Sequence, residues 1–152
     1  MENLKSLITN IMTKDFVFVD TDTLMLEVDK IFNSKSFHYL PVLDEEKRAV
    51  GVISKTDYCT LLHHFTHKKL GDYERSNRMH FRSLRAEDVM TKNPVSINLN
   101  QTVEDAMDIF LKNKHRSVLI TNEEGNCIGI CTPFDVIKWV KMVNSKMSKQ
   151  AI

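Results

Sequence analysis

The stretches GVISKTD, residues 51–57, and GICTPFD, residues 129–135, decide the fold of this chain. In each stretch an apolar run stops at a hydroxyl residue, Ser54 or Thr132, and an aspartate follows three positions later. A hydroxyl residue with an acid at that spacing is typical of the start of a helix. Both stretches therefore predict a strand that ends where a helix begins.

The rest of the chain repeats at the same interval, the 78 residues that separate Asp57 from Asp135. The clearest further match is IMTK, residues 11–14, which recurs as VMTK, residues 89–92. Other pairs at this interval are Ile31-Phe32 with Ile109-Phe110, Glu45-Glu46 with Glu123-Glu124, and Gly51 with Gly129. Repeated units bury their apolar faces against each other. We therefore expect two copies of one unit, packed as a pseudo-twofold pair.

Within each copy the hydrophobic pattern predicts the order β-α-β-β-α. A short extended piece precedes an amphipathic helix, and two apolar runs around a polar turn precede a closing helix. The expected positions are 16–19, 22–32, 38–43, 49–54 and from Lys55 in the first copy, and 95–97, 103–110, 117–121, 127–132 and from Pro133 in the second. The predicted fold class is α/β (α+β): two units, each a small sheet packed with helices.

The segment between the copies differs from both in composition. We place the first repeat at residues 8–65, a connector at 66–85 and the second repeat at 86–144. Basic residues and histidines are frequent around the connector: His63, His64, His67, Lys68, Lys69, Arg75, Arg78, His80, Arg82 and Arg85. His63 and His67 share a helix face, but structural zinc takes four ligands and no acidic or cysteine partner stands nearby. We expect a solvated basic surface and no metal.

The overall composition is that of an ordinary globular protein, with 152 residues, 42% hydrophobic residues and a formal net charge of +1. A nearly neutral chain gives no global reason to expect nucleic acid or an acidic membrane as a partner. The three cysteines show no C-x-x-C spacing, so reduced thiols are expected. The sequence has neither the apolar run of a signal peptide nor about 18 consecutive apolar residues. We expect a cytoplasmic protein without membrane contact.

Two interpretations of the Ser54–Asp57 and Thr132–Asp135 pairs are open. As helix caps, each would stabilise its helix by roughly 1 kcal/mol. As ligand contacts, each aspartate would accept hydrogen bonds from both hydroxyls of a ribose, and the helix N-terminus would suit a phosphate. Both roles can hold at once.

Several motifs at consistent spacing resemble those of tandem CBS domains, the pair often called a Bateman module. They are the two Met-Thr openings, the strand FHYLPV at residues 37–42, and the two Gly-x-x-Ser/Thr-x-x-Asp endings. The resemblance covers the chain from about Ile8 to Val143. It implies a cleft between the copies that binds an adenine nucleotide or adenosyl ligand, such as AMP, ADP, ATP or S-adenosylmethionine.

The resemblance also implies two sites. One combines Ser54 and Asp57 with Ala106 and Arg116, and the other combines Thr132 and Asp135 with Thr23, Val28 and His38. Arg116 is expected to grip a phosphate bidentately, and His38 is a weaker, pH-dependent counterpart. Val28 stands where a small residue is usual, and Val118-Leu119-Ile120 stands where Leu-Pro-Val is usual. We therefore expect better occupancy at the Asp57 site.

Two functions follow as hypotheses. The first is a sensor in which a nucleotide shifts the equilibrium between arrangements of the two copies and acts on a separate effector protein. The second is a ligand-free module for dimerisation or protein interaction. An enzyme is not expected, because the G-x-S-x-G, H-E-x-x-H, G-x-x-x-x-G-K-[ST] and G-x-G-x-x-G motifs are all missing. The resemblance and the amphipathic helices favour a homodimer.

Overall fold

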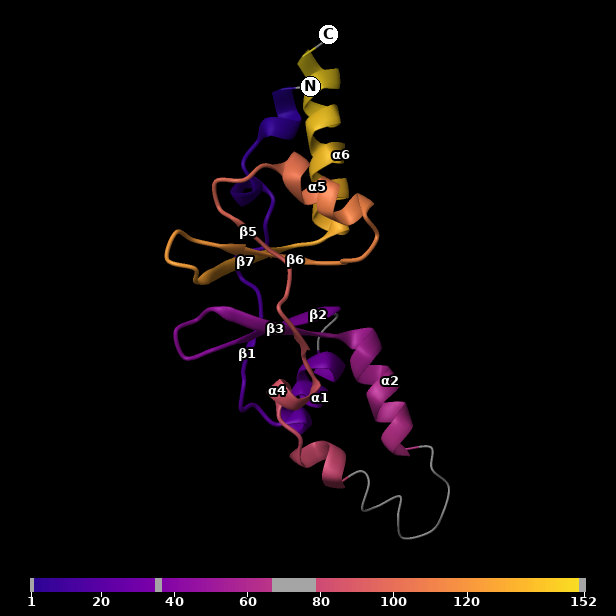
Figure 1. Ribbon diagram of the computed structural model, residues 1–152. Helices are drawn as coiled ribbons and strands as arrows, with labels where there is room; N and C mark the ends of the chain where they lie inside the picture. The colour runs from indigo at the N-terminus through magenta and orange to yellow at the C-terminus, as the bar shows by residue number, and fades with distance from the viewer. Residues whose placement is uncertain (1, 35–36, 67–78, 151–152) are drawn as a thin grey trace. The chain divides into compact units, whose positions relative to one another are not determined.

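The computed structural model describes residues 2–34, 37–66 and 79–150. They fold into two compact units, drawn in Figure 1, and each unit has its own sheet and its own core. The four-stranded unit comprises residues 17–94. The three-stranded unit comprises residues 1–16 together with residues 95–152. Two small sheets packed with helices were predicted, and this fold class is confirmed.

The four-stranded unit carries its helices on one face of the sheet (Figure 1). Its strands lie in the order β1-β2-β3-β4, with β1 and β2 parallel and the other neighbours antiparallel. Its elements are β1 (Val19–Asp20), α1 (Met25–Ser34), β2 (Tyr39–Leu43), β3 (Ala49–Ser54), α2 (Lys55–Thr66), α4 (Ala86–Val89) and β4 (Thr91–Lys92). Its core includes Phe81, which lies in a helical stretch at residues 79–83, within the expected connector. The remainder of that connector, 67–78, lies outside the described residues.

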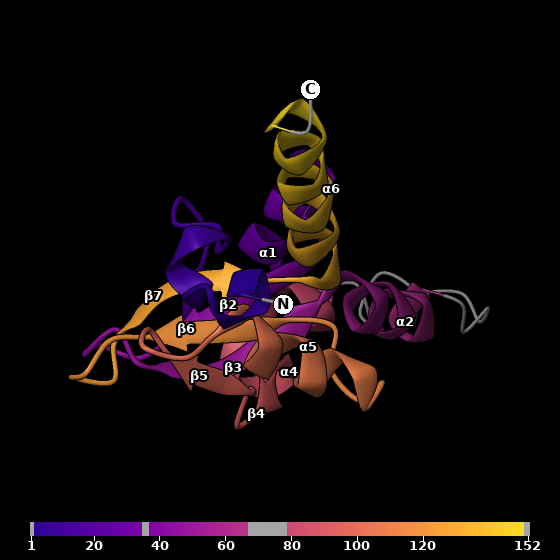
Figure 2. The same cartoon turned by 90° about the horizontal axis from the view of Figure 1, so that it is seen from above.

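The three-stranded unit repeats this plan, with α5 and α6 on the same face of its sheet (Figures 1 and 2). Its strands lie in the order β5-β6-β7, with β5 and β6 parallel and β6 and β7 antiparallel. Its elements are η1 (Glu2–Lys5), η2 (Ile8–Asn10), β5 (Ser96–Asn98), α5 (Val103–Leu111), β6 (Val118–Thr121), β7 (Cys127–Cys131) and α6 (Pro133–Gln150).

The first helices of the two copies begin differently. Helix α5 has a capping box: the N–H of Thr102 donates to Asp105 Oδ2 at 2.7 Å, and the N–H of Asp105 donates to Thr102 Oγ1 at 3.3 Å. The bond from the N–H of Thr102, together with one from the Thr102 hydroxyl to Asp105 Oδ2 at 2.7 Å, holds the pKa of the Asp105 carboxyl below its usual value. In the first copy, Thr23 Oγ1 instead accepts a hydrogen bond from the N–H of Asp20 at 3.1 Å. Helix α1 therefore begins at Met25, after the predicted Asp22-Thr23 start.

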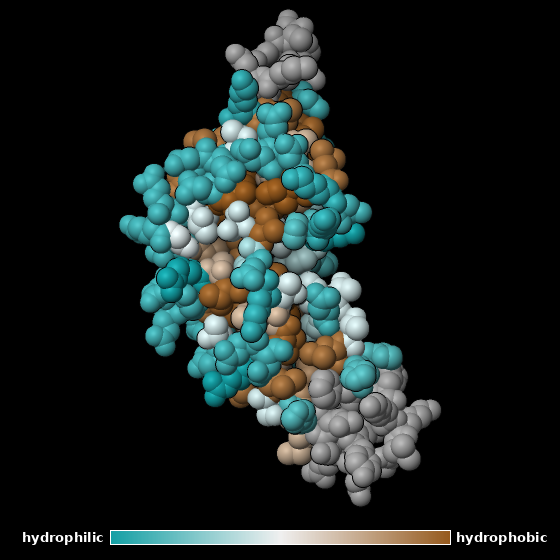
Figure 3. Space-filling view, in the orientation of Figure 1, coloured by the Kyte–Doolittle hydropathy of each residue, from teal (hydrophilic) through white to brown (hydrophobic). Residues whose placement is uncertain are grey.

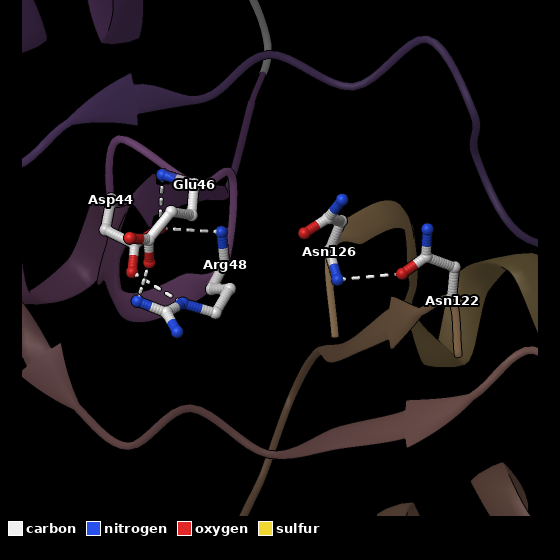
Figure 4. A network of polar contacts seen from close by, with 5 residues as sticks. All are labelled: Asp44, Glu46, Arg48, Asn122 and Asn126. Atoms are coloured by element: carbon white, nitrogen blue, oxygen red, sulfur yellow. Dashed lines mark hydrogen bonds and ion pairs between the residues drawn. The ribbon is translucent and has the colours of Figure 1, made fainter. Parts of the chain in front are cut away.

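The two predicted turns are built alike (Figure 4). Asp44 Oδ1 accepts hydrogen bonds from the N–H groups of Glu46 and Arg48 at 3.0 and 2.8 Å. Asn122 Oδ1 accepts the matching bonds from Glu124 and Asn126 at 3.1 and 2.8 Å. The fourth residue of each turn has a positive φ, which is 62° at Lys47 and 86° at Gly125. An aspartate or asparagine at the first position thus closes each hairpin.

Each copy opens with a Met-Thr segment, residues 11–14 in the first copy and 89–92 in the second. Each of these two openings lies in the unit that contains the hairpin of the other copy. Thr13 of the first opening pairs with Ile130 of β7 through N–H to O distances of 2.8 and 3.1 Å. Strand β4 of the second opening pairs with β3, with Thr91 opposite Val52. The four-stranded sheet therefore includes the opening of the second repeat as β4, and the opening of the first repeat pairs with β7 at an isolated bridge.

A glycine in each hairpin makes this exchange possible. A Cβ atom on Gly129 would lie 2.7 Å from the Sδ atom of Met12 and 3.2 Å from the carbonyl oxygen of Thr13. Gly51 is in the same position against Met90. Only a residue without a side chain lets the opening approach so closely.

Gly129→Ala should therefore destabilise the protein by about 1–3 kcal/mol, as overpacking of a filled site does. In a Met12→Ala background the same substitution should cost clearly less, because the methionine side chain is the nearest obstacle. Urea unfolding of the parent, the two single variants and the double variant measures both costs. An equal cost of Gly129→Ala in both backgrounds would contradict the packing of Met12 on β7.

Candidate functional site

The Ser54–Asp57 pair lies where β3 ends and α2 begins. The N–H of Asp57 donates to Ser54 Oγ at 3.0 Å, and the Ser54 hydroxyl donates to Asp57 Oδ2 at 2.6 Å. The N–H of Lys55 donates to the carbonyl oxygen of His38 at 2.8 Å, which ties the start of α2 to the residue before β2. The Asp57 side chain is exposed.

The Thr132–Asp135 pair lies in the same place between β7 and α6. Asp135 Oδ2 accepts hydrogen bonds from the N–H of Thr132 at 2.8 Å and from its hydroxyl at 2.7 Å. The N–H of Asp135 donates to the carbonyl oxygen of Thr132 at 3.0 Å. Pro133 opens the helix at a position where its missing N–H costs nothing.

These bonds engage only one oxygen of each carboxylate. Within the described part of the chain, Oδ1 of Asp57 and Oδ1 of Asp135 accept no hydrogen bond, whereas both Oδ2 atoms accept at least one. A carboxylate has about four lone-pair sites. Each aspartate can therefore keep its bond to Ser54 or Thr132 and still accept hydrogen bonds from a ligand.

The remaining predicted site residues fall into two groups. The side chains of Val28 and Ala106 are 0% exposed and belong to the cores of their units. His38 and Arg116 are exposed, and Thr23 is half-buried. The better occupancy expected at the Asp57 site stays a prediction. Which of these residues share a site stays a prediction.

A hollow of about 180 Å³ lies beside Asp135 and is called here the Trp139 hollow. It is lined by Asn10, Ile11, Asp135, Lys138, Trp139 and Met142. The sequence analysis missed all of these except Asp135. The spacing of residues 135, 138, 139 and 142 places them on one helix face and is a usable signal. The contribution of Asn10 and Ile11 depends on the exchanged opening, which the repeat does not reveal.

A second hollow, of about 260 Å³, lies between α5 and α6 and is called here the Val136 hollow. Its lining is Met107, Phe110, Leu111, Asn113, His115, Arg116, Pro133, Val136 and Ile137. Figure 3 shows hydrophobic side chains reaching the surface over these two helices. Leu111 and Ile137 are 78% and 62% exposed.

The repeat explains how the Val136 hollow arises. At the position of Val136 the first copy has Tyr58, whose ring packs 5.1 Å from that of Phe32 and 6.0 Å from that of Phe81. The Tyr58 hydroxyl donates a hydrogen bond to Asp29, which corresponds to Met107. Burial, together with Asp29, raises the pKa of that hydroxyl far above its usual range. The small Val136 side chain leaves open a space that an aromatic ring fills in the first copy.

None of the helices described combines the length and apolar character that crossing a membrane requires. Across residues 2–34, 37–66 and 79–150, no three His, Cys, Asp or Glu side chains gather as a metal site would require. His67 of the His63–His67 pair lies outside these residues.

Comparison with known sequences identifies a family and distant relatives. The sequence model of the CBS domain matches residues 8–64 and 86–142. The uncharacterized protein MJ1426 of Methanocaldococcus jannaschii is 26% identical over 87% of this chain and 89% of its own. The inosine-5'-monophosphate dehydrogenase of the same organism is 26% identical over 92% of this chain, which spans 25% of the enzyme.

Comparison with solved structures shows the same fold. CBSX2 from Arabidopsis thaliana, crystallised in complex with AMP, has a TM-score of 0.75 at 22% identity, over 91% of this chain and 98% of that one. The CBS domain pair of MJ0100, in complex with 5'-methylthioadenosine and S-adenosyl-L-methionine, has a TM-score of 0.68 at 20% identity, over 88% and 98%.

The cysteines provide a test of how the strand before Thr132 is buried. Burial raises the pKa of the Cys131 thiol to about 12, and the negative charge of Asp135 adds to the rise. Burial also raises the pKa of Cys127, whereas Cys59 is exposed on α2. Because the thiolate is the reactive form, a raised pKa keeps a thiol inert at pH 8. An aromatic disulfide reagent should therefore label one of the three thiols rapidly in the native protein.

The fast phase of labelling should vanish in Cys59→Ser. In the parent protein unfolded in urea, all three thiols should react in the fast phase. Native labelling of all three thiols at one rate would contradict the burial of β7.

Proposed function

The chain belongs to the CBS domain family, as a tandem pair, and from that premise we propose that it is a regulatory sensor of adenine nucleotides. In this proposal an adenine nucleotide or adenosyl ligand binds at the aspartate that opens α2 or α6, and the bound state acts on a separate effector protein. One observation carries the proposal: each of these aspartates accepts hydrogen bonds from its serine or threonine partner through one carboxylate oxygen only, which leaves the other oxygen for a ligand.

The free oxygens suit a ribose. A ribose presents two neighbouring hydroxyl donors, and a carboxylate oxygen accepts such bonds strongly because it is charged. AMP in the CBSX2 complex and S-adenosyl-L-methionine in the MJ0100 complex share the adenosyl group, which supports this ligand class. Arg116, exposed before β6, is the residue proposed to meet a phosphate.

We further propose that the protein is a homodimer. A homodimer is also expected under the alternative hypothesis, in which the protein is a ligand-free interaction module. Its support is the apolar surface around the Val136 hollow, where Leu111, Phe134 and Ile137 are exposed. Apolar patches of this kind mark interaction surfaces. A second copy would bring its own Phe134 as a bulky apolar side chain of the kind that Tyr58 supplies in the first repeat.

Asp57→Asn and Asp135→Asn test the ribose contact against a purely structural cap. Asparagine keeps the side-chain shape and an oxygen for the helix start, but it loses the charge. Hydrogen bonds to a charged group contribute about 1.5–3 kcal/mol, so affinity for AMP at the altered site should fall about ten- to over a hundred-fold. Titration calorimetry measures this loss, and melting without ligand should change little.

Arg116→Ala serves as a comparison variant, because it should weaken AMP while leaving adenosine nearly unaffected. If both aspartate variants bind AMP like the parent, or only melt earlier, the ribose contact is wrong and the aspartates are caps alone.

Light scattering behind a sizing column should report a mass of about twice the 17.6 kDa of one chain. Ile137→Glu should shift the protein towards monomer, because it places a charge on the apolar surface. Lys141→Glu, which puts the same glutamate on an exposed position of α6, is the matched control and should stay dimeric. A monomeric parent at tens of micromolar would rule out the dimer.

A further inference from the structure

We propose that the Val136 hollow and the loop beside it bind an acidic segment of the effector protein, with one bulky apolar side chain of that segment inserted in the hollow. The proposal rests on the sensor function proposed above and adds the place and the chemistry of the partner. The loop comprises residues 112–116, between α5 and β6. It is called here the basic loop because it contains Lys112, Lys114, His115 and Arg116.

The second repeat has an apolar helix surface that its fold does not require. Leu111, Phe134 and Ile137 are exposed around the hollow. At the same positions the first repeat has exposed residues that are smaller or more polar, namely Asn33, Thr56 and Cys59. Because both repeats form the same β-α-β-β-α unit, folding does not explain the three apolar side chains. A cluster of such side chains is typical of an interaction surface.

The hollow has room for one aromatic side chain from another molecule. Its volume is about 260 Å³, and a cavity of about 150 Å³ with an apolar lining already binds benzene. In the first repeat the ring of Tyr58 occupies the matching space, and Phe37 packs against the same core. The second repeat has Val136 and exposed His115 at these two positions. An inserted ring would therefore restore contacts that the first repeat makes with its own side chains.

The basic loop lies at the edge of the hollow. Asn113, His115 and Arg116 are part of the lining. Asn113 fixes the start of the loop, because its N–H donates to the carbonyl oxygen of Phe110 at 2.9 Å and its φ is 53°. A residue with positive φ in this place ends a helix. The loop therefore leaves α5 directly beside the apolar surface.

The positive charges of the loop have no counterpart on this surface. The side chains of Lys112, Lys114 and Arg116 are exposed and form no hydrogen bond or ion pair within the described part of the chain. Neither Asp108 on α5 nor Asp135 on α6 lines the hollow. A surface that is apolar in the middle and positive at the edge is complementary to an acidic segment with an apolar anchor.

A second copy of the chain is the competing occupant, because the homodimer proposed above covers the same apolar residues. A second copy would bring another basic loop to the contact, and charges of like sign weaken an interface. An acidic segment would neutralise the loop instead. We therefore expect the effector segment to displace the second copy where both are present.

The probe is a fluorescent synthetic peptide in which one phenylalanine stands within a run of glutamates. Two matched peptides carry alanine in place of the phenylalanine, or lysines in place of the glutamates. The full-length protein is titrated into each peptide, and fluorescence anisotropy is recorded. We expect the phenylalanine peptide to bind saturably and about 10- to 150-fold more tightly than the alanine peptide, because burial of the ring is lost. The lysine peptide should not bind, and raising the salt concentration from about 0.05 M to about 0.5 M should weaken binding of the acidic peptides.

Three variants locate the contact. Val136→Tyr supplies the ring that Tyr58 supplies in the first repeat, so its affinity for the phenylalanine peptide should fall to that for the alanine peptide, which it should bind like the parent. Lys114→Glu should weaken both acidic peptides by about 2- to 30-fold at low salt. Lys14→Glu, the same change at an exposed position in the first opening of the same unit, is the matched control and should bind like the parent. Arg116 is not altered, because it is also the proposed phosphate contact.

Light scattering with saturating phenylalanine peptide should report the mass of a single chain. Absence of peptide binding, equal affinity for the phenylalanine and alanine peptides, or unchanged binding in Val136→Tyr would overturn the docking surface. A dimer that binds the peptide without dissociating would also overturn it. Circular dichroism melting of each variant distinguishes a loss of recognition from a loss of folding.

Calorimetric titration of the parent and of Val136→Tyr with AMP keeps the two proposals apart, because Val136 has no place in the proposed nucleotide site. Binding of AMP without binding of the peptide would overturn the docking surface and leave the nucleotide function standing. Binding of the peptide without binding of AMP would overturn the nucleotide function and leave the docking surface standing.

Discussion

The close contact between a hairpin glycine and an opening methionine, Gly51 with Met90 and Gly129 with Met12, shapes the rest of the molecule. Because these glycines have no side chain, each opening lies against the hairpin that comes from the other repeat. Each hairpin pairs with the opening of the other repeat, so each compact unit, with its own core, contains residues of both repeats. The same exchange carries Asn10 and Ile11 to the start of α6, where they meet Asp135 and Trp139.

The second determinant is that the two oxygens of one aspartate carboxylate have different partners. In both repeats a hydroxyl residue ends a strand and donates its hydroxyl hydrogen to one carboxylate oxygen of the aspartate three residues later. The bonds that do this leave one carboxylate oxygen without a protein donor in the described structure. The cap and ligand interpretations therefore do not compete. The fold needs one oxygen of the carboxylate, and the proposed function uses the other.

The sequence predicted those features that depend on local chemistry. Ser54, Asp57, Thr132 and Asp135 stand where an apolar run meets a helix, and the β-α-β-β-α order follows from hydrophobic spacing. The start of α1 was placed early, because Thr23 looked like a helix start whereas its hydroxyl oxygen closes the turn before Met25.

Features that depend on contacts distant in sequence were not predictable. The repeat places one Met-Thr opening before each hairpin. This pattern is the same whether an opening pairs with the hairpin of its own copy or with that of the other copy, so the sequence does not predict the exchange. The Trp139 hollow depends on that exchange. The Val136 hollow is understood only by comparison with the first repeat, where the ring of Tyr58 fills the matching space. There Tyr58 packs against Phe81, which comes from the expected connector. At Val28 and Ala106 the sequence pattern does not distinguish a core residue from a residue that contacts a ligand.

The most direct test of the account is a two-dimensional amide NMR titration of the isotope-labelled protein with AMP. The account predicts saturable shifts that concentrate at the helix starts around Ser54–Asp57 or Thr132–Asp135, with small changes elsewhere in the two sheets. Spectra that stay unchanged at millimolar AMP, or shifts that avoid both helix starts, would contradict it.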